Sequence, residues 1–142
     1  MLISTAHSLI ITDEESKLKV VRTEKAPLPV GPYSQGMRAG NMLFVSGQGP
    51  LDPKIKKTVG LDIGSQTKQT LENVKAILAA GEMTLESVVK VSVFLKDIGD
   101  FKKMNDVYSL FFPTNPPART TIQAQLAMSD WLIEIDAIAC SG

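Results

Sequence analysis

The spacing of apolar residues predicts an amphipathic helix over residues 62–80. The residues that recur on its apolar side are Ile63, Thr67, Leu71, Val74, Ile77 and Leu78. Asp62 can cap the first turn by accepting backbone hydrogen bonds, and Gly81 suits the stop at the end. A helix of this kind packs one side on a hydrophobic core.

A second helix is predicted to begin at a cap formed by Asp97 or Asp100 and to run to Phe112. Its apolar stripe consists of Phe101, Met104, Tyr108, Phe111 and Phe112. Because proline cannot continue a helix, the stop is supplied by Pro113, Pro116 and Pro117.

The first third of the chain predicts short strands. Residues 17–22 can form one, and a proline-rich connector follows. Residues 34–39 and 42–48 flank Gly40-Asn41, a two-residue turn typical of a β-hairpin. Residues 42–45 are apolar throughout, so we expect this strand to be covered on both faces.

Three more strands are predicted over residues 88–95, 119–125 and 131–140. One face of the first carries Val89, Val91, Val93 and Leu95. We expect the last two strands to pair as a hairpin, with their polar residues on the face of the sheet that the helices leave uncovered. Whether Arg119 and Glu134 share a face depends on the register of this hairpin, which the sequence does not fix.

The order hairpin, helix, strand, helix, hairpin predicts an α+β fold, in which a mixed sheet has two helices packed on one face. The chain has 142 residues, which fits a single domain. We assign residues 17–142 to that domain and residues 1–16 to an N-terminal extension.

Composition narrows the chemistry that the chain can carry. Hydrophobic residues make up 44% and charged residues 21%, and 15 basic residues balance 15 acidic ones. A chain without net positive charge lacks the electrostatic attraction expected of a nucleic-acid binder. The single histidine, His7, and the single cysteine, Cys140, argue against a His/Cys metal site, a Ser-His-Asp triad or an intrachain disulfide.

The expected location is the cytoplasm or another reducing compartment. No apolar run approaches the ~20 residues that cross a bilayer, so no membrane partner is expected. The apolar N-terminal stretch has no basic residue and continues into acidic ones, so a mitochondrial or plastid address is the less favoured alternative.

Arg119 is the first candidate for a functional residue. It follows Pro116-Pro117-Ala118, so rigid prolines place its guanidinium at the start of a strand. A guanidinium can bind a small carboxylate through two parallel hydrogen bonds, which suits that ligand better than the point charge of a lysine. The alternative is a surface arginine in a weak salt bridge.

Five further residues are candidates, each with a structural alternative. Glu134 lies within an apolar strand, where a carboxylate serves either as a general acid/base or as a partner in an ion pair. Asn105 could point into a polar pocket or be a solvated amide. Tyr33 could close over a small ligand or simply pack. Ser46 and Gly47 could end a strand or bring the backbone close to an anion.

Ordered motifs over about residues 20–139 resemble the Rid family (RidA/YjgF), small proteins that include reactive-intermediate imine deaminases. The motifs include Gly31-Pro32-Tyr33-Ser34-Gln35-Gly36, Phe44-Val45-Ser46-Gly47-Gln48, Phe94-Leu95-Lys96-Asp97, Pro117-Ala118-Arg119 and Glu134-Ile135-Asp136-Ala137. The resemblance implies a chorismate-mutase-like α+β fold and a homotrimer. The sheets would line a barrel, and the sites would lie in clefts between subunits.

The same resemblance implies roles for individual positions. Arg119 would hold the substrate carboxylate, and Glu134 matches the glutamate of the family's pattern. The other positions that match pocket residues are Tyr33, Ser46, Gly47 and Asn105. The sequence departs from the family's pattern at two positions that would affect the pocket. Thr121 stands at a substrate-binding position where many members have cysteine, and Trp131 is unusual before the last strand.

The function implied is that of a 2-iminobutanoate/2-iminopropanoate deaminase, which hydrolyses 2-imino or 2-enamino acids to 2-keto acids and ammonia. Glu134 and backbone groups near Gly47 would hold the attacking water while Arg119 clamps the carboxylate. No metal or organic cofactor would be needed. The alternative is a trimer that binds small carboxylates, or a protein partner in a translation- or chaperone-type role, without turnover.

Overall fold

The computed structural model describes residues 18–142. The predictions of an N-terminal extension and of a possible mitochondrial or plastid targeting role concern residues outside this range. The elements in chain order are β1 (Leu18–Val21), β2 (Gly36–Ala39), β3 (Met42–Gln48), α1 (Ile63–Ala80), η1 (Leu85–Ser87), β4 (Val88–Leu95), η2 (Ile98–Asp100), α2 (Phe101–Phe111), β5 (Ala118–Gln123) and β6 (Ile133–Cys140).

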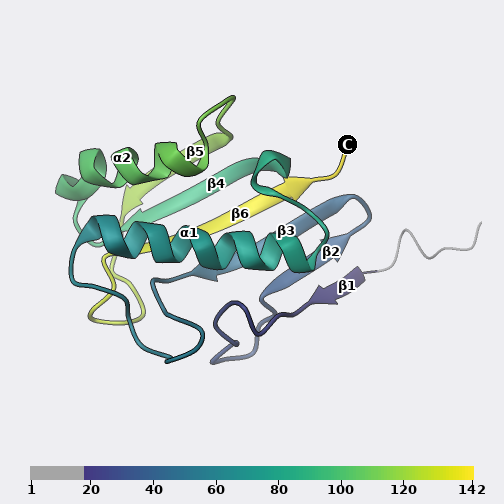
Figure 1. Cartoon of the computed structure of the whole chain (residues 1–142), viewed down its shortest axis with the longest axis horizontal. Coiled ribbons are helices and arrows are strands. Elements are labelled where there is room, and N and C mark those ends of the chain that lie inside the picture. Colours follow the sequence, from purple (N-terminus) through teal and green to yellow (C-terminus); the bar gives the residue numbers. More distant parts are fainter. Residues whose placement is uncertain (1–17) are drawn as a thin grey trace, which may run out of the picture.

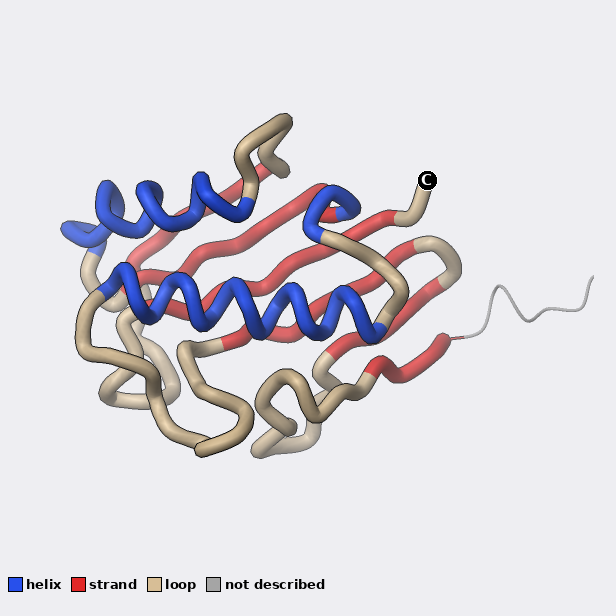
Figure 2. Tube along the Cα trace, in the orientation of Figure 1, coloured by secondary structure: helices blue, strands red, loops and turns tan. Residues whose placement is uncertain are grey.

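A six-stranded sheet has the strand order β1-β2-β3-β6-β4-β5 (Figure 1). Its neighbouring strands are antiparallel except β4 and β5, which run parallel. Figure 2 shows both long helices on the same face of this sheet. The predicted α+β class, a mixed sheet with two helices on one face, is therefore confirmed.

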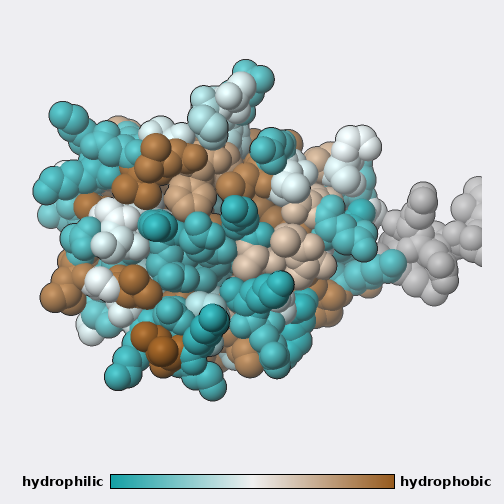
Figure 3. All heavy atoms as spheres, in the orientation of Figure 1, coloured by the Kyte–Doolittle hydropathy of each residue, from teal (hydrophilic) through white to brown (hydrophobic). Residues whose placement is uncertain are grey.

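The hydrophobic core lies between the sheet and the helices. The largest fully buried apolar side chains are Leu43, Leu71, Ile77, Leu78, Leu95, Met104, Ile133 and Ile135. Figure 3 views the molecule from the helix side, where the surface over α1 is mainly hydrophilic. Within residues 18–142, no helix combines the length and hydrophobicity needed to cross a membrane.

The predicted helix caps are largely confirmed. Asp62 Oδ2 accepts a hydrogen bond from Ser65 N at 2.9 Å, and Gly81 follows the last turn of α1. Asp97 Oδ1 accepts one from Gly99 N at 2.8 Å and so caps η2, the short turn that leads into α2. Asp100, the other candidate, makes no side-chain cap bond.

The prediction of a hairpin between the last two strands is wrong. β5 pairs in parallel with β4, because α2 carries the chain back to the same end of the sheet before β5 begins. β6 then enters between β3 and β4 and pairs antiparallel with both. β6 therefore lies inside the sheet, and β5 lies at its edge.

The face of the sheet that the helices leave open is more apolar than predicted. One row across four strands consists of Val20, Met37, Phe44 and Ile138, and the next consists of Leu18, Ala39, Met42 and Cys140. Phe44 is 44% exposed, so the expectation that β3 is covered on both faces is wrong for the single chain. Val89 is exposed too, because a bulge between Val88 and Lys90 turns Val88 toward the core in its place.

Three buried side-chain amides fix loops that meet at one end of β3 and β6. Gln35 Nε2 donates to the carbonyls of Thr23, Ala26 and Pro27. Asn73 Nδ2 donates to the carbonyls of Gly49 and Leu51. Gln66 Nε2 donates to Gly60 O and Asp130 O, and its Oε1 accepts from Leu132 N at 2.7 Å. These amides position the loops because loop backbone groups have no strand partner of their own.

We expect Gln66→Met to lower the free energy of unfolding by about 2–3 kcal/mol, since it leaves the Leu132 N–H and two loop carbonyls without their partner. Urea unfolding followed by circular dichroism measures the change. Lys68→Met, at an exposed position of the same helix, is the matched control and should stay within about 0.5 kcal/mol of wild type. Equal stabilities of the two variants would contradict the role of Gln66.

Candidate functional site

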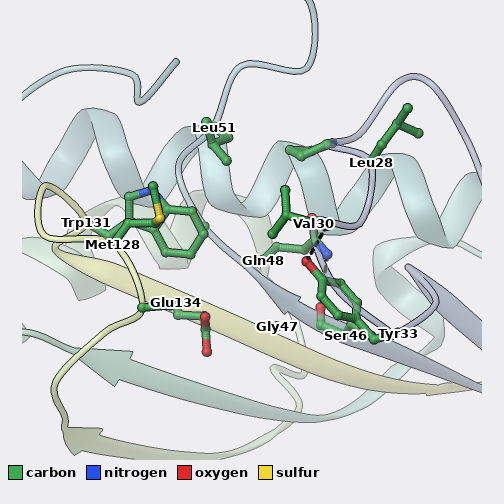
Figure 4. Close-up of a pocket in the computed structure, with 13 residues that line it drawn as sticks. Leu28, Val30, Tyr33, Ser46, Gly47, Gln48, Leu51, Met128, Trp131 and Glu134 are labelled. Atoms are coloured by element: carbon green, nitrogen blue, oxygen red, sulfur yellow. Dashed lines mark hydrogen bonds between the residues drawn. The ribbon is translucent and has the colours of Figure 1, made fainter. Parts of the chain in front are cut away.

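A pocket of about 400 Å³ opens where β3 and β6 meet the three loops fixed by the buried amides. We call it the Glu134 pocket. It brings together four of the predicted site residues, Tyr33, Ser46, Gly47 and Glu134 (Figure 4). Its remaining walls are mostly apolar, with Leu28, Val30, Leu51, Met128 and Trp131 among the lining residues. Few polar groups in an apolar pocket are typical of a small-ligand site.

A bulge in β3 shapes the polar side of the pocket. Ser46 and Gly47 lie between two register points, Val45 opposite Ala137 and Gln48 opposite Ile135, so two residues of β3 oppose one of β6. A Cβ atom at Gly47 would lie 2.9 Å from Glu134 Oε2, which shows how closely the carboxylate approaches this backbone. A side chain at this position would push the Glu134 carboxylate away from the backbone, so glycine allows the close approach.

Glu134 is a half-buried carboxylate that has no cationic partner among residues 18–142. Burial, and to a smaller degree the negative charge of Asp136, raise the pKa of Glu134 above its ordinary value of 4.5. Within residues 18–142 the one salt bridge joins Arg38 to Glu82. The ion-pair alternative for Glu134 is therefore not what the single chain shows, and a raised pKa suits a group that exchanges protons.

Two other polar residues of the pocket are held by local hydrogen bonds. Ser46 Oγ donates to Ser34 O at 2.5 Å, and Tyr33 OH accepts from Val30 N at 3.3 Å. The Tyr33 side chain is 48% exposed and lies at the pocket mouth, on the side opposite Trp131 (Figure 4). In this structure Tyr33 therefore packs against its own loop at the edge of the pocket.

Trp131 forms the opposite wall and was not among the predicted site residues. Its ring lies so close to Gly49 that a Cβ atom there would overlap it. Its Nε1–H is buried without a hydrogen-bond partner in the described part of the chain. In the sequence Trp131 lies two residues before the apolar strand β6, and this position alone only weakly indicates a pocket residue.

Arg119, Asn105 and Thr121 lie elsewhere, on the helix side of the sheet. Arg119 pairs with Val91 and Thr121 with Val93, and both valines face the core. The Arg119 guanidinium lies over two rings of α2, with its Cζ 4.6 Å from the centroid of Tyr108 and 5.6 Å from that of Phe101. We call these five residues, Phe101, Asn105, Tyr108, Arg119 and Thr121, the Arg119 cluster.

The Arg119 cluster contains an unusual concentration of unpaired polar atoms. Asn105 Oδ1, Tyr108 OH and Thr121 Oγ1 are all buried and have no hydrogen-bond partner among residues 18–142. Buried polar groups are normally paired, so these three atoms call for partners that residues 18–142 of a single chain do not supply. Burial raises the pKa of Tyr108, which the Arg119 charge partly opposes, so the phenol is neutral.

A single chain does not bring Arg119 and Glu134 together. Glu134 pairs with Phe94, and Phe94 with Ile122, on the open face, whereas Arg119 faces the helices from the same edge strand as Ile122. The predicted site residues thus form two groups on opposite faces. Tyr108 and Phe101 belong to the second group, although their apolar spacing had marked them only as packing residues. The available signal was their spacing on the helix, since Phe101 lies four residues before Asn105 and Tyr108 lies three residues after it.

We expect Gly49→Ala to cost about 1–3 kcal/mol, because the added methyl group must displace the Trp131 ring. Gly49 does not have a positive φ, so alanine is compatible with the backbone and the cost isolates the contact. In a Trp131→Ala background the same substitution should cost much less. A double-mutant cycle by urea unfolding measures the coupling, and equal costs in both backgrounds would refute the contact.

We expect the folded state to lose stability as pH rises from about 4.5 through the raised pKa of Glu134. In that window the folded chain still holds a proton that the unfolded chain has released, so each increase in pH favours unfolding. Glu134→Gln removes this contribution. Thermal unfolding of both proteins is measured at one fixed concentration across this pH range. The Tm of the variant should rise relative to that of wild type as pH increases. A Tm difference that does not change with pH would count against the raised pKa.

Comparison with known proteins places the chain among close relatives. A "RutC family protein" of Pyrococcus horikoshii is 52% identical over 121 residues, which cover 85% of this chain and 96% of the relative. A "2-iminobutanoate/2-iminopropanoate deaminase" of Salmonella typhimurium is 43% identical over 124 residues, 85% of this chain and 96% of that protein. The crystal structure of Escherichia coli TdcF with bound serine superposes with a TM-score of 0.83 at 37% identity, covering 87% of this chain and 99% of TdcF.

The model of the family described as "Endoribonuclease L-PSP" matches residues 23–141, nearly the whole described chain. This match, together with the two relatives, shows that the chain belongs to the Endoribonuclease L-PSP family, the family of the Rid (RidA/YjgF) proteins.

Proposed function

We propose that the protein hydrolyses 2-imino and 2-enamino acids, such as 2-iminobutanoate and 2-iminopropanoate, to 2-keto acids and ammonia. A relative 43% identical carries this activity in its name, and another relative holds serine, a small amino acid with a carboxylate. Such substrates are reactive metabolites, so the role would be their removal. The observation that carries the proposal is that the Arg119 guanidinium is held over aromatic rings and forms no salt bridge within residues 18–142.

Arg119 is available to an anionic ligand. No carboxylate of residues 18–142 forms a salt bridge with it, since the one such pair joins Arg38 to Glu82. Its charge is instead held over aromatic rings, in a cluster with three buried polar atoms that have no hydrogen-bond partner in the described part of the chain. A partly buried guanidinium with unused donors is suited to bind a carboxylate through two parallel hydrogen bonds.

The site would be completed by a second copy of the chain. Arg119 and Glu134 face opposite sides of the sheet, so one chain cannot present both to one small substrate. The open face also carries the two apolar rows that end at Ile138 and Cys140, which a partner copy would cover. We infer a homotrimer in which the Glu134 pocket of one subunit meets the Arg119 cluster of the next.

In this arrangement Arg119 binds the substrate carboxylate and turns the C=N carbon toward Glu134. The substrate reacts as the protonated imine. The ionised Glu134 takes a proton from water as the water oxygen forms a bond to the C=N carbon, which gives a tetrahedral aminoalcohol. Glu134 returns this proton to the nitrogen and then accepts the hydroxyl proton as the C–N bond breaks, so that ammonia leaves, the keto acid remains, and Glu134 passes its proton to solvent. A raised pKa brings Glu134 closer to neutrality, where a group can both accept and return a proton.

We expect Glu134→Gln to lower the rate of keto-acid formation by about 100-fold, because it removes the proton acceptor, and Arg119→Ala to raise KM. The assay couples the protein to a dehydratase that releases 2-aminoacrylate and subtracts the rate without the protein. Arg22→Ala, which removes an exposed arginine, is the matched control. A wild-type rate no higher than the spontaneous one would end the proposal and favour a trimer that only binds.

Mixing the two variants, assayed at a substrate concentration far below the raised KM so that each alone is nearly inactive, tests where the site lies. Trimers that contain both Arg119→Ala and Glu134→Gln chains have one interface with both groups intact. After subunit exchange at equal amounts, about a quarter of the wild-type activity should return, as expected for random assembly of a cyclic trimer. Activity that stays at the level of the separate variants would show that the two residues do not meet between subunits.

A further inference from the structure

We propose that Phe101 and Tyr108 are positioning residues for Arg119, whose guanidinium both rings attract while leaving its N–H edge to the substrate carboxylate. The inference rests on the proposed function, because it explains how the group that would bind the substrate is oriented. It assigns a task to two aromatic residues of α2 that would otherwise count as part of its apolar stripe.

The Arg119 guanidinium lies within cation–π range of two rings of α2. Phe101 and Tyr108 are seven residues apart, about two turns, so they lie on the same face of this helix. Arg119 Cζ is 5.6 Å from the Phe101 centroid and 4.6 Å from the Tyr108 centroid. Both distances fall within the ~6 Å over which a ring attracts a cation.

Aromatic rings can orient an arginine without using its hydrogen-bond donors. A ring attracts the flat face of the guanidinium, so the N–H groups, which lie in the plane, remain free at its edge. A protein carboxylate would orient the same side chain by occupying that edge, and the substrate would then have to displace it. Within residues 18–142 no such carboxylate is paired with Arg119. The rings therefore provide orientation that does not compete with the ligand.

The ring of Tyr108, rather than its hydroxyl, performs this task. Tyr108 is 5% exposed and its ring also packs on Phe112, with 4.8 Å between centroids, so the ring has a fixed place in the core. Its hydroxyl is buried and forms no hydrogen bond of good geometry with any group in residues 18–142, although the nearby Arg119 lowers the pKa of Tyr108 against the effect of burial. Phe101 lies farther from Arg119 and is 42% exposed, so its share of the attraction should be smaller.

The test measures binding of two stable ligands by calorimetry: 2-oxobutanoate, which has the carboxylate, and 2-oxobutanamide, which lacks its charge. We expect Tyr108→Leu to weaken binding of 2-oxobutanoate by about ten-fold, and Phe101→Leu by about three-fold, as removal of a cation–π contact predicts. Binding of 2-oxobutanamide should change little. Tyr108→Phe and Phe101→Tyr keep a ring and should retain most of the affinity. Leu110→Ala, at a position of α2 that is 76% exposed, is the control.

Several results would overturn the inference. They are unchanged binding of 2-oxobutanoate by both leucine variants, an equal loss for both ligands, and a loss in Tyr108→Phe as large as in Tyr108→Leu. If Tyr108→Leu does not fold, binding of 2-oxobutanoate by Phe101→Leu and Phe101→Tyr decides the inference. These variants should fold, because Phe101 is 42% exposed.

The deaminase assay on the same proteins separates this inference from the proposed function. If the protein is active, the leucine variants should raise KM more than they lower kcat. Partial loss of folding would instead lower the apparent kcat and leave KM unchanged. A wild type that binds 2-oxobutanoate without turnover defeats the proposed function alone, and the ring variants then still decide the inference. A wild type that fails to bind 2-oxobutanoate overturns the inference as well.

Discussion

Strand β6 is hydrogen-bonded to β3 on one side and to β4 on the other, and its alternate residues Ile133, Ile135, Ala137 and Ala139 are buried. This pairing decides the positions of most other features. It joins the N-terminal hairpin to the β4–β5 pair, so that a single sheet carries both helices. It also moves β5 to the edge. Because strand residues alternate between faces, Glu134 then faces away from the helices, while Arg119 faces α2. The division of the candidate site into two groups follows from the strand order.

Features that depend on neighbours in sequence were predictable. The apolar spacing of α1, its cap at Asp62 and the turn at Gly40-Asn41 are local signals, and the structure has all three. The site residues could be chosen from their chemistry, and the motifs they lie in resemble one family. The pairing of β6 could not be predicted, because it joins segments far apart in the chain and several strand orders satisfy the same alternation. The bulge at Val88 was missed for a related reason, since one extra residue reverses the faces without changing the composition.

The two groups of site residues differ in what restrains them. The Glu134 pocket is shaped by close contacts to backbone, where Gly47 allows the carboxylate to approach and Gly49 allows the Trp131 ring to do so. The Arg119 cluster is shaped by rings on a helix, and three of its polar atoms have no hydrogen-bond partner among residues 18–142. The Glu134 pocket thus supplies a mostly apolar cavity, and the Arg119 cluster supplies a positive charge and hydrogen-bonding groups. If both meet between subunits, shape and charge would come from different copies of one chain.

The buried amides of Gln35, Gln66 and Asn73 contact main-chain groups of the loops and none of their side chains. Every amino acid supplies the same carbonyl oxygen, so most loop positions could change identity while the anchoring hydrogen bonds persist. Leu28, Val30 and Met128 line the pocket from these loops and can therefore vary independently of the framework. This separation would let evolution diversify ligand preference in descendants of one stable scaffold, with mutations at the rim tested one at a time at little risk to folding.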